Sequence, residues 1–160
     1  DNGIEGLLAQ LPHAKFDLLN ANYDVSKTEL SSFIKPYKIY KMGKLKIGVF
    51  GLGVDLKGLV NKKQYGNIIY MDALEIAKDI EKHLKLNEKC DLIICLSHLG
   101  YDYKNEPNKI SDLKIAAQTH YIDIIIGGHT HTFLDQPTLM KNLNHKKVLI
   151  NQVGCFGLHL

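Results

Sequence analysis

Two short apolar segments, each followed closely by histidine, constrain the fold of this chain more than any other feature. Residues 92–96 and 122–126 are almost entirely aliphatic, and a helical pattern at about 111–120 lies between them. A strand, a helix and a second strand in this order predict a βαβ unit, whose right-handed crossover makes the two strands parallel. Because both strands are nearly all apolar, we expect the sheet to be covered on both faces.

Further helices and strands are predicted around this unit. An amphipathic helix is expected over residues 4–11, and the clearest helix runs over 73–84, with Asp72 as its N-cap and Glu75 placed as in a capping box. A chain of 160 residues can form one compact domain, so we predict a single α/β domain. The remaining predicted strands form two hairpins and one separate strand, at 37–41 with 44–50, 138–141 with 147–153, and 16–21.

The histidines that follow the two apolar strands are the candidate metal ligands. Parallel strands joined by a crossover end at the same edge of the sheet, where ligands of open α/β sheets bind. His98 follows the first strand, and His129 and His131 follow the second. Residues two apart in extended backbone point to the same side, so His129 and His131 are expected to face one site. Gly127 and Gly128 let the backbone approach it. Imidazole suits zinc and other transition metals.

Composition restricts the chemistry that the chain can use. All 20 basic residues are lysine, and with 17 acidic residues they give a net charge of +3, which predicts a solvated surface and no nucleic-acid partner. Without arginine, a phosphate must be held by metal, lysine, backbone N–H groups or residues outside the chain. The acidic candidates are few: Asp102, Asp123 and Asp135. No apolar run is long enough to span a membrane.

Three further features are assigned no catalytic or binding role. Gly48, Gly51 and Gly53 lack the third glycine and the following helix of a nucleotide-binding loop, so we expect a strand that leaves the core through a tight turn. Cys95 lies within the apolar strand and is predicted to be a buried, inert thiol. Ser97 has no nucleophile-elbow pattern around it, and we assign it no catalytic role.

The residues from Cys90 to Gly100 and from Ile122 to His131 resemble the calcineurin-like metallophosphoesterases, in particular the 5'-nucleotidase branch. The resemblance implies part of a four-layer α/β/β/α sandwich with mixed sheets and a centre of two divalent metal ions. It implies that His98 and His129 bind one ion and His131 the other. Zinc, manganese or iron is expected, with magnesium or calcium as alternatives. A bridging hydroxide would hydrolyse phosphomonoesters, nucleoside 5'-monophosphates first among them.

The resemblance also bears on the ends of the chain. Asp1-Asn2-Gly3 resembles the residues that follow a Gly-Asn-His-Glu-Phe motif, so Asp1 is expected to orient the catalytic histidine of that motif. The other ligand motifs of the family are not in the sequence. Residues 1–160 are therefore predicted to be a catalytic domain truncated at both ends, with little or no activity alone. The family's frequent export predicts a periplasmic or extracellular location.

Two alternatives remain open from the residues alone. A mononuclear zinc hydrolase or lyase could use His98, His129 and His131 with water as the fourth ligand. A non-catalytic domain could keep the fold, with or without one metal, while binding a partner or ligand. The number of metal ions per chain and the dependence of activity on them distinguish these possibilities.

Overall fold

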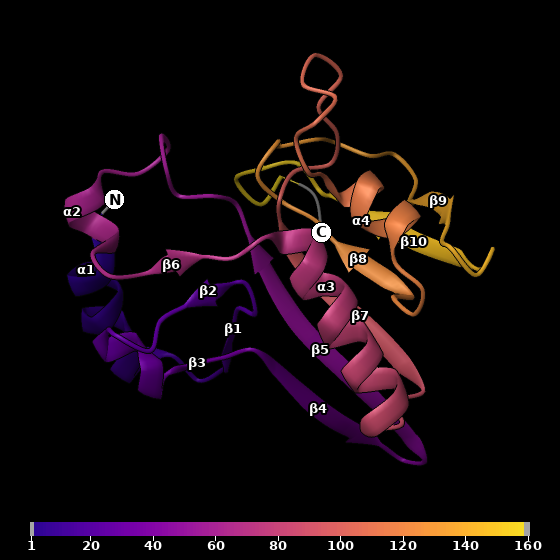
Figure 1. Ribbon diagram of the computed structural model, residues 1–160, viewed down its shortest axis with the longest axis horizontal. Coiled ribbons are helices and arrows are strands. Elements are labelled where there is room, and N and C mark those ends of the chain that lie inside the picture. The colour runs from indigo at the N-terminus through magenta and orange to yellow at the C-terminus, as the bar shows by residue number, and fades with distance from the viewer. Residues whose placement is uncertain (1, 159–160) are drawn as a thin grey trace.

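A six-stranded mixed sheet forms the centre of the computed structural model, which describes residues 2–158. The four central strands are parallel to their neighbours, and an antiparallel hairpin closes each edge (Figure 1). This arrangement confirms the predicted α/β class, the parallel pair and both hairpins. In sheet order the strands are β4 (Tyr37–Met42), β5 (Leu45–Gly53), β7 (Leu92–His98), β8 (Ile124–Ile126), β10 (Lys147–Asn151) and β9 (Thr138–Lys141).

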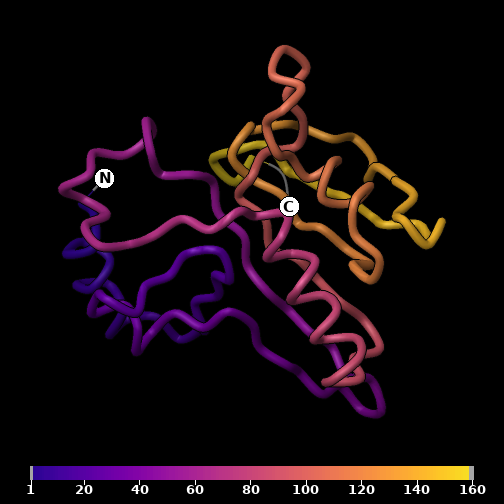
Figure 2. The backbone as a smooth tube through the Cα atoms, viewed as in Figure 1, coloured from indigo at the N-terminus to yellow at the C-terminus, as the bar shows by residue number. Residues whose placement is uncertain are grey.

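The N-terminal quarter of the chain and a segment after β5 form a smaller lobe beside this sheet. Figure 2 shows the indigo N-terminal segment at the left, well away from the yellow C-terminal hairpin. The predicted strand at 16–21 is wrong in extent, because only two residues pair there. The lobe contains α1 (Gly3–Gln10), η1 (Leu11–His13), β1 (Leu18–Leu19), β2 (Tyr23–Asp24), η2 (Glu29–Ser32), β3 (Ile34–Lys35), α2 (Lys62–Tyr65) and β6 (Ile69–Tyr70).

Two helices cover one face of the main sheet. The helix α3 (Ala73–Lys82) continues into a π-helical turn, η3 (His83–Asn87), and α4 (Asp112–Gln118) lies beside it on the same face (Figure 1). The Asp72 carboxylate accepts hydrogen bonds from the N–H groups of Leu74 and Glu75, both at 3.0 Å, which confirms the predicted cap. The residues of 2–158 include no helix with the length and apolar character needed to cross a bilayer.

The opposite face of the sheet is open. Leu96 is 40% exposed and Ile126 is 51% exposed, whereas Ile93, Cys95 and Ile125 on the helix side are fully buried. The expectation that both faces would be covered is therefore wrong for the described residues. Apolar sequence alone cannot reveal this, because both faces carry aliphatic side chains and only one meets helices of this chain. Burial raises the pKa of the Cys95 thiol well above its usual value, as expected for an inert cysteine.

Glycines in β5 permit a close approach between the sheet and the small lobe. A Cβ at Gly51 would lie 2.0 Å from the Leu19 carbonyl oxygen, and the Ala21 N–H donates to the Gly51 carbonyl at 2.8 Å. The strand runs on through Gly53, so the expected tight turn within this glycine-rich stretch is wrong. The glycines serve the packing of one segment against another.

A buried glutamate joins α3 to the segment that leads into β8. The Glu81 side chain is 1% exposed and accepts hydrogen bonds from the backbone N–H groups of His120, Tyr121 and Ile122 at 2.7, 2.7 and 3.1 Å. Burial raises the pKa of Glu81, and these three N–H groups oppose the rise. The contacts fix the end of the crossover that places β8 beside β7.

Glu81→Ala is expected to lower the free energy of unfolding by about 3–5 kcal/mol, because buried N–H groups lose their acceptor. Glu75→Ala on the exposed face of the same helix is the control and should cost about 0.5 kcal/mol or less. Urea denaturation followed by circular dichroism measures both variants. Equal losses for the two variants would contradict the role given to Glu81.

Candidate functional site

The first two candidate histidines meet at the carboxyl ends of neighbouring parallel strands. His98 is the last residue of β7, and His129 follows β8 after two glycines. The register pairs Leu96 with Ile126, which brings the two strand ends level. The imidazole rings of His98 and His129 lie 5.1 Å apart in an edge-to-face arrangement. The predicted proximity of these two residues is confirmed.

The backbone of the histidine turn differs from the predicted extended chain. His129 has φ 77° and His131 has φ 52°, both in the left-handed region. The Thr130 N–H donates to the Gly128 carbonyl at 3.0 Å, which closes a tight turn. The expectation that His129 and His131 face one side because they alternate along an extended strand is therefore wrong. The turn itself decides where each ring points.

The third candidate, His131, has its ring beside Phe156 and takes no part in the ring contact between His98 and His129. It is exposed, and its ring centre lies 6.0 Å from that of Phe156. Within residues 2–158, no three side chains of histidine, cysteine, aspartate or glutamate form a cluster with metal-binding geometry. The structure thus brings His98 and His129 together and leaves His131 at the edge of the site. Asp1, the candidate for orienting a catalytic histidine, lies outside the described residues.

Burial and neighbouring charges favour the neutral form of the paired imidazoles. Burial lowers the pKa of His98, and His131 adds to this effect. Burial also lowers the pKa of His129, with smaller contributions from His98, Lys109 and His131. A neutral imidazole keeps a nitrogen lone pair that can bind a metal ion. The electrostatics therefore suit the predicted ligand role of these two residues.

Both glycines before His129 are required by the side chains next to them. A Cβ at Gly128 would lie 3.1 Å from Nδ1 of His98, and a Cβ at Gly127 would lie 2.2 Å from Oδ2 of Asp112. The absence of a side chain at Gly128 lets the His98 ring lie against the turn. In the structure the close approach is to protein side chains, and the predicted approach of this backbone to a ligand stays a prediction.

Asp112 is a buried carboxyl next to the site that sequence reasoning missed. It is fully buried at the first residue of α4, where its Oδ1 accepts a hydrogen bond from the Ser97 hydroxyl. Its Oδ2 has no hydrogen-bond partner within the described residues. Burial raises the pKa of Asp112 to about 7, which the Ser97 hydrogen bond partly opposes. In the sequence, an aspartate after Ser111 looks like an ordinary first-turn residue, so no local signal marks it.

Gln152 is a second residue near the site for which no role was predicted from the sequence. Its Nε2 donates to the Gly128 carbonyl at 2.8 Å, and its Oε1 accepts from the Thr130 hydroxyl at 3.1 Å and from the Thr132 N–H. Gln152 is 1% exposed. One buried amide therefore holds the turn on both sides of His129.

The acidic residues considered from the sequence lie elsewhere. The Asp123 carboxylate accepts a hydrogen bond from the Ile93 N–H at 2.9 Å and joins β7 to the start of β8. Asp102 is partly exposed in the polar loop after β7, and Asp135 is exposed after the histidine turn. The described structure gives Asp123 a structural role.

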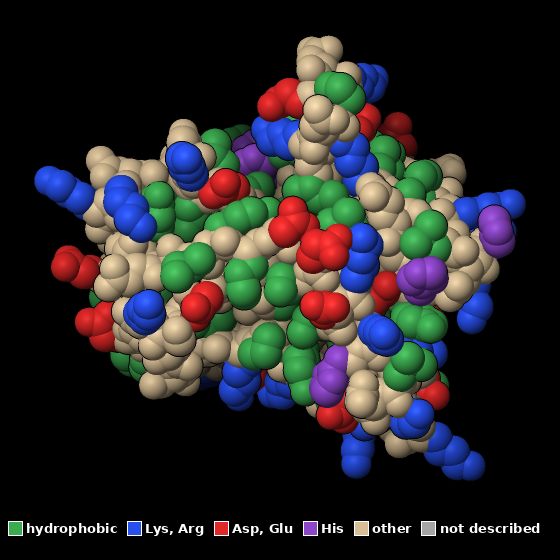
Figure 3. All heavy atoms as spheres, viewed as in Figure 1, with side chains coloured by type: hydrophobic (Ala, Val, Ile, Leu, Met, Phe, Trp, Pro, Cys, Tyr) green, Lys and Arg blue, Asp and Glu red, His purple; other side chains and the backbone are tan. Residues whose placement is uncertain are grey.

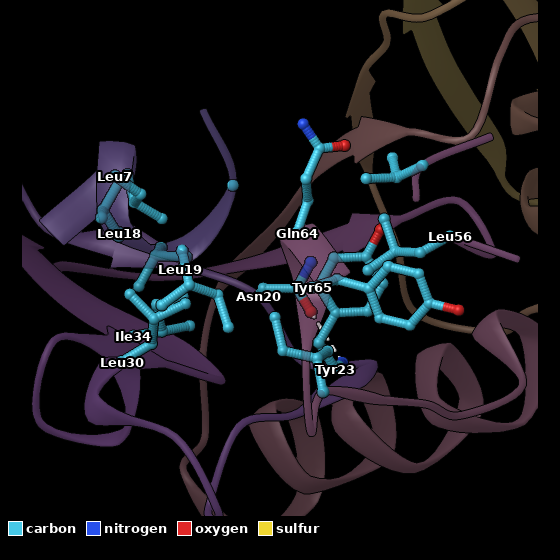
Figure 4. Close-up of a pocket in the computed structure, with 14 residues that line it drawn as sticks. Leu7, Leu18, Leu19, Asn20, Tyr23, Leu30, Ile34, Leu56, Gln64 and Tyr65 are labelled. Carbon is cyan, nitrogen blue, oxygen red and sulfur yellow. Dashed lines mark hydrogen bonds between the residues drawn. The ribbon is translucent and has the colours of Figure 1, made fainter. Parts of the chain in front are cut away.

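Two of the hollows in the described structure bear on the site, one at the sheet edge and one in the small lobe. A hollow of about 460 Å³ includes His98, with Leu96, Ile126 and Tyr23 in its lining. A cavity of about 300 Å³ lies inside the small lobe, where Leu7, Leu18 and Leu30 gather on one side and Tyr23 and Tyr65 on the other (Figure 4). The described lining of this second cavity includes no histidine or carboxylate. Of these two hollows, the one at the sheet edge contains a candidate ligand, His98.

The donors at the sheet edge fit part of a transition-metal site. His98 and His129 offer nitrogen atoms on adjoining rings, and imidazole nitrogen suits zinc, manganese or iron better than magnesium or calcium. Because Gly128 has no side chain, nothing from Gly128 covers Nδ1 of His98, which would lie 3.1 Å from a Cβ at that position. A complete site needs more ligands than these two, and His131 is the nearest candidate in the sequence.

Comparison with known proteins gives relatives over most of the chain. No protein-family model matches. An apyrase of Tabanus yao is 31% identical over 100% of this chain and 30% of its own length, and a 5'-nucleotidase of Vibrio cholerae is 33% identical over 88% of this chain and 27% of its own. The structure of a 5'-nucleotidase precursor from Thermus thermophilus matches with a TM-score of 0.78 and 30% identity over 91% of this chain and 29% of that one.

The apyrase and the Vibrio cholerae 5'-nucleotidase match this chain in sequence, and the Thermus thermophilus structure matches it in sequence and fold. The chain therefore belongs to the calcineurin-like metallophosphoesterases. Within that class it is a member of the 5'-nucleotidase branch, and the names of its relatives are names of hydrolases. The chain spans about 30% of the length of the relatives it matches.

Proposed function

We propose that this chain is part of the catalytic domain of a metal-dependent phosphomonoesterase that hydrolyses nucleoside 5'-monophosphates. The contact between His98 and His129 at the ends of two parallel strands, with rings 5.1 Å apart, carries the proposal. The names of the relatives support the substrate class, because they include 5'-nucleotidases and an apyrase.

In this proposal the three candidate histidines hold two divalent ions. His98 and His129 share one ion, and His131 binds the other after its exposed side chain turns away from Phe156. Divalent ions held there would neutralise charge on the phosphate oxygens and acidify the attacking water. The neutral imidazoles of His98 and His129 supply lone pairs, and Gln152 holds the turn that carries His129. Asp1 keeps its proposed role of orienting a catalytic histidine.

The phosphate must be bound without arginine. The chain contains none, and lysines and carboxylates are interspersed over the face shown in Figure 3. Lys109 is the lysine whose charge acts on His129, and its ammonium group lies 3.2 Å from a Glu106 oxygen. In the proposed site the charge of the metal ions therefore binds most of the phosphate, and lysine contributes less.

Metal content and phosphate release test the function together. In the gene product that contains this chain, we expect two metal ions per chain and hydrolysis of AMP that falls about 100-fold or more after chelation. Mass spectrometry of the metals and a phosphate-release assay measure the two quantities. One zinc ion per chain with full activity would favour the mononuclear alternative. Metal binding without hydrolysis of any phosphomonoester would favour a non-catalytic domain.

We also propose that residues 1–160 alone have little or no phosphatase activity, because the other ligand motifs of the family are absent from the sequence. The same assay, run on the isolated chain with Mn²⁺ or Zn²⁺, should show release near the uncatalysed level. Robust hydrolysis by the isolated chain would contradict this expectation. Export to the periplasm or cell exterior remains part of the proposal, supported by the family resemblance and by a relative named as a precursor.

A further inference from the structure

We propose that Asp112 is a positioning residue that sets the distance between two segments. The first is residues 97–100, which carry His98 and are called the His98 turn. The second is the turn at residues 127–130, which carries His129. The inference rests on the proposed function, because it concerns the arrangement of the proposed ligands. It arises from a buried carboxyl that lies between the two turns and has hydrogen bonds or close contacts to both.

Asp112 holds the first turn on both sides of His98. The Ser97 hydroxyl donates to Oδ1 of Asp112 and accepts from the Leu99 N–H at 3.1 Å. The Asp112 N–H donates to the Gly100 carbonyl at 2.8 Å. The residues immediately before and shortly after His98 are thus tied to the start of α4, which leaves the backbone at His98 little freedom.

The other carboxylate oxygen of Asp112 faces the second turn. A Cβ added at Gly127 would lie 2.2 Å from Oδ2 and 3.2 Å from Nε2 of Gln152. Asp112 and Gln152 therefore both lie on the side of Gly127 that a Cβ would occupy, two residues before His129. Gln152 holds the turn through the Gly128 carbonyl, while Asp112 limits how closely that turn can approach the His98 turn.

The buried position of Asp112 makes this role specific. A carboxyl without full hydrogen bonding is costly to bury, and its Oδ2 has no partner among the described residues. One oxygen of the Asp112 carboxyl accepts the hydrogen bond from Ser97, and the other lies directly beside Gly127. Residues that support metal ligands in this way commonly alter metal affinity 10- to 100-fold when replaced, roughly.

The test uses the 160-residue chain and Zn²⁺ alone, measured by calorimetry. Asp112→Asn removes the negative charge and places an amide N–H group against Gly127, and Ser97→Ala removes the hydrogen bond that holds the His98 turn. Each is expected to weaken Zn²⁺ binding by about 10- to 100-fold. Ser97→Thr should restore most of the affinity, because it restores the hydroxyl. Asp79→Asn, on the exposed side of α3, is the matched control and should bind as the parent does.

A second measurement is independent of metal. In the metal-free chain, nuclear Overhauser effects between the His98 and His129 rings should be present in the parent and in Asp79→Asn and weakened in Asp112→Asn and Ser97→Ala. If the parent binds no Zn²⁺, the ring contact decides the role of Asp112. Unchanged ring contacts in both variants, with the fold retained by circular dichroism, would overturn the inference.

A double-mutant cycle measures the coupling between Asp112 and Gly127 directly, so the conclusion does not depend on the fold stability of one variant. Gly127→Ala introduces a Cβ that would collide with the Asp112 carboxyl, so we expect it to weaken the ring contact in the parent and to have a smaller effect in Asp112→Ala. Additive effects of the two substitutions would show that the carboxyl and Gly127 act independently, and would overturn the inference.

Discussion

Replacing His129 by asparagine is expected to lower the affinity of the chain for Zn²⁺ by about 100-fold or more, because a ligand should matter more than the residues that support it. Asparagine tolerates the left-handed backbone that His129 adopts at φ 77°, so the turn should survive the loss of the ring. Calorimetric titration with Zn²⁺ measures the effect, and circular dichroism confirms that the fold is kept.

His13→Ala provides the control for this experiment. His13 is exposed at the end of η1, in the small lobe, and its replacement should leave Zn²⁺ affinity unchanged. If His129→Asn binds as tightly as His13→Ala, then His129 is not a ligand and the proposed site is wrong. A loss in both variants would point to nonspecific binding of Zn²⁺ by surface histidines.

Asp112→Asn is expected to flatten the dependence of stability on pH. The pKa of Asp112 rises from 3.8 to about 7 in the folded chain, so the folded state favours the protonated carboxyl. The stabilising contribution of that proton is complete below pH 3.8 and is lost as pH rises through about 7. At about 1.4 kcal/mol per pKa unit, the free energy of unfolding should fall by about 4 kcal/mol over this window from this group alone.

Urea denaturation of the parent, Asp112→Asn and the exposed control Asp79→Asn at several pH values between about 4 and 8 measures the effect. The stability of Asp112→Asn relative to the parent should increase by about 4 kcal/mol across this range, while Asp79→Asn should follow the parent. Parallel curves for all three proteins would show that Asp112 is ionised in the folded chain throughout. A variant that is more stable at neutral pH yet binds Zn²⁺ less tightly would separate positioning from stability.

The fold of the central unit could be predicted because its signals are local. Aliphatic runs before His98 and before His129, with a helical pattern between them, specify strand, helix and strand, and the handedness of the crossover then makes the strands parallel. The cap at Asp72 and both hairpins are equally local features. The strand predicted at 16–21 failed because its pairing depends on β3, a partner made of only two residues.

The candidate site could be predicted only in part. The shared sheet edge brings His98 and His129 together as expected, but the left-handed turn and the direction of His131 depend on tertiary contacts from Gln152 and Phe156. Those contacts join segments that are far apart in the sequence. A two-residue spacing alone could not define the geometry of that turn.

The sequence by itself determined the mixed α/β class, the parallel strands and the meeting of His98 with His129, because hydrophobic periodicity and crossover handedness act along short stretches of chain. Only the tertiary structure decided that one sheet face is open and that Asp112 is buried between the histidine turns. Burial of a polar side chain depends on which distant residues pack around it. At Asp112 those residues are Ser97 and Gly127, each 15 residues away along the chain.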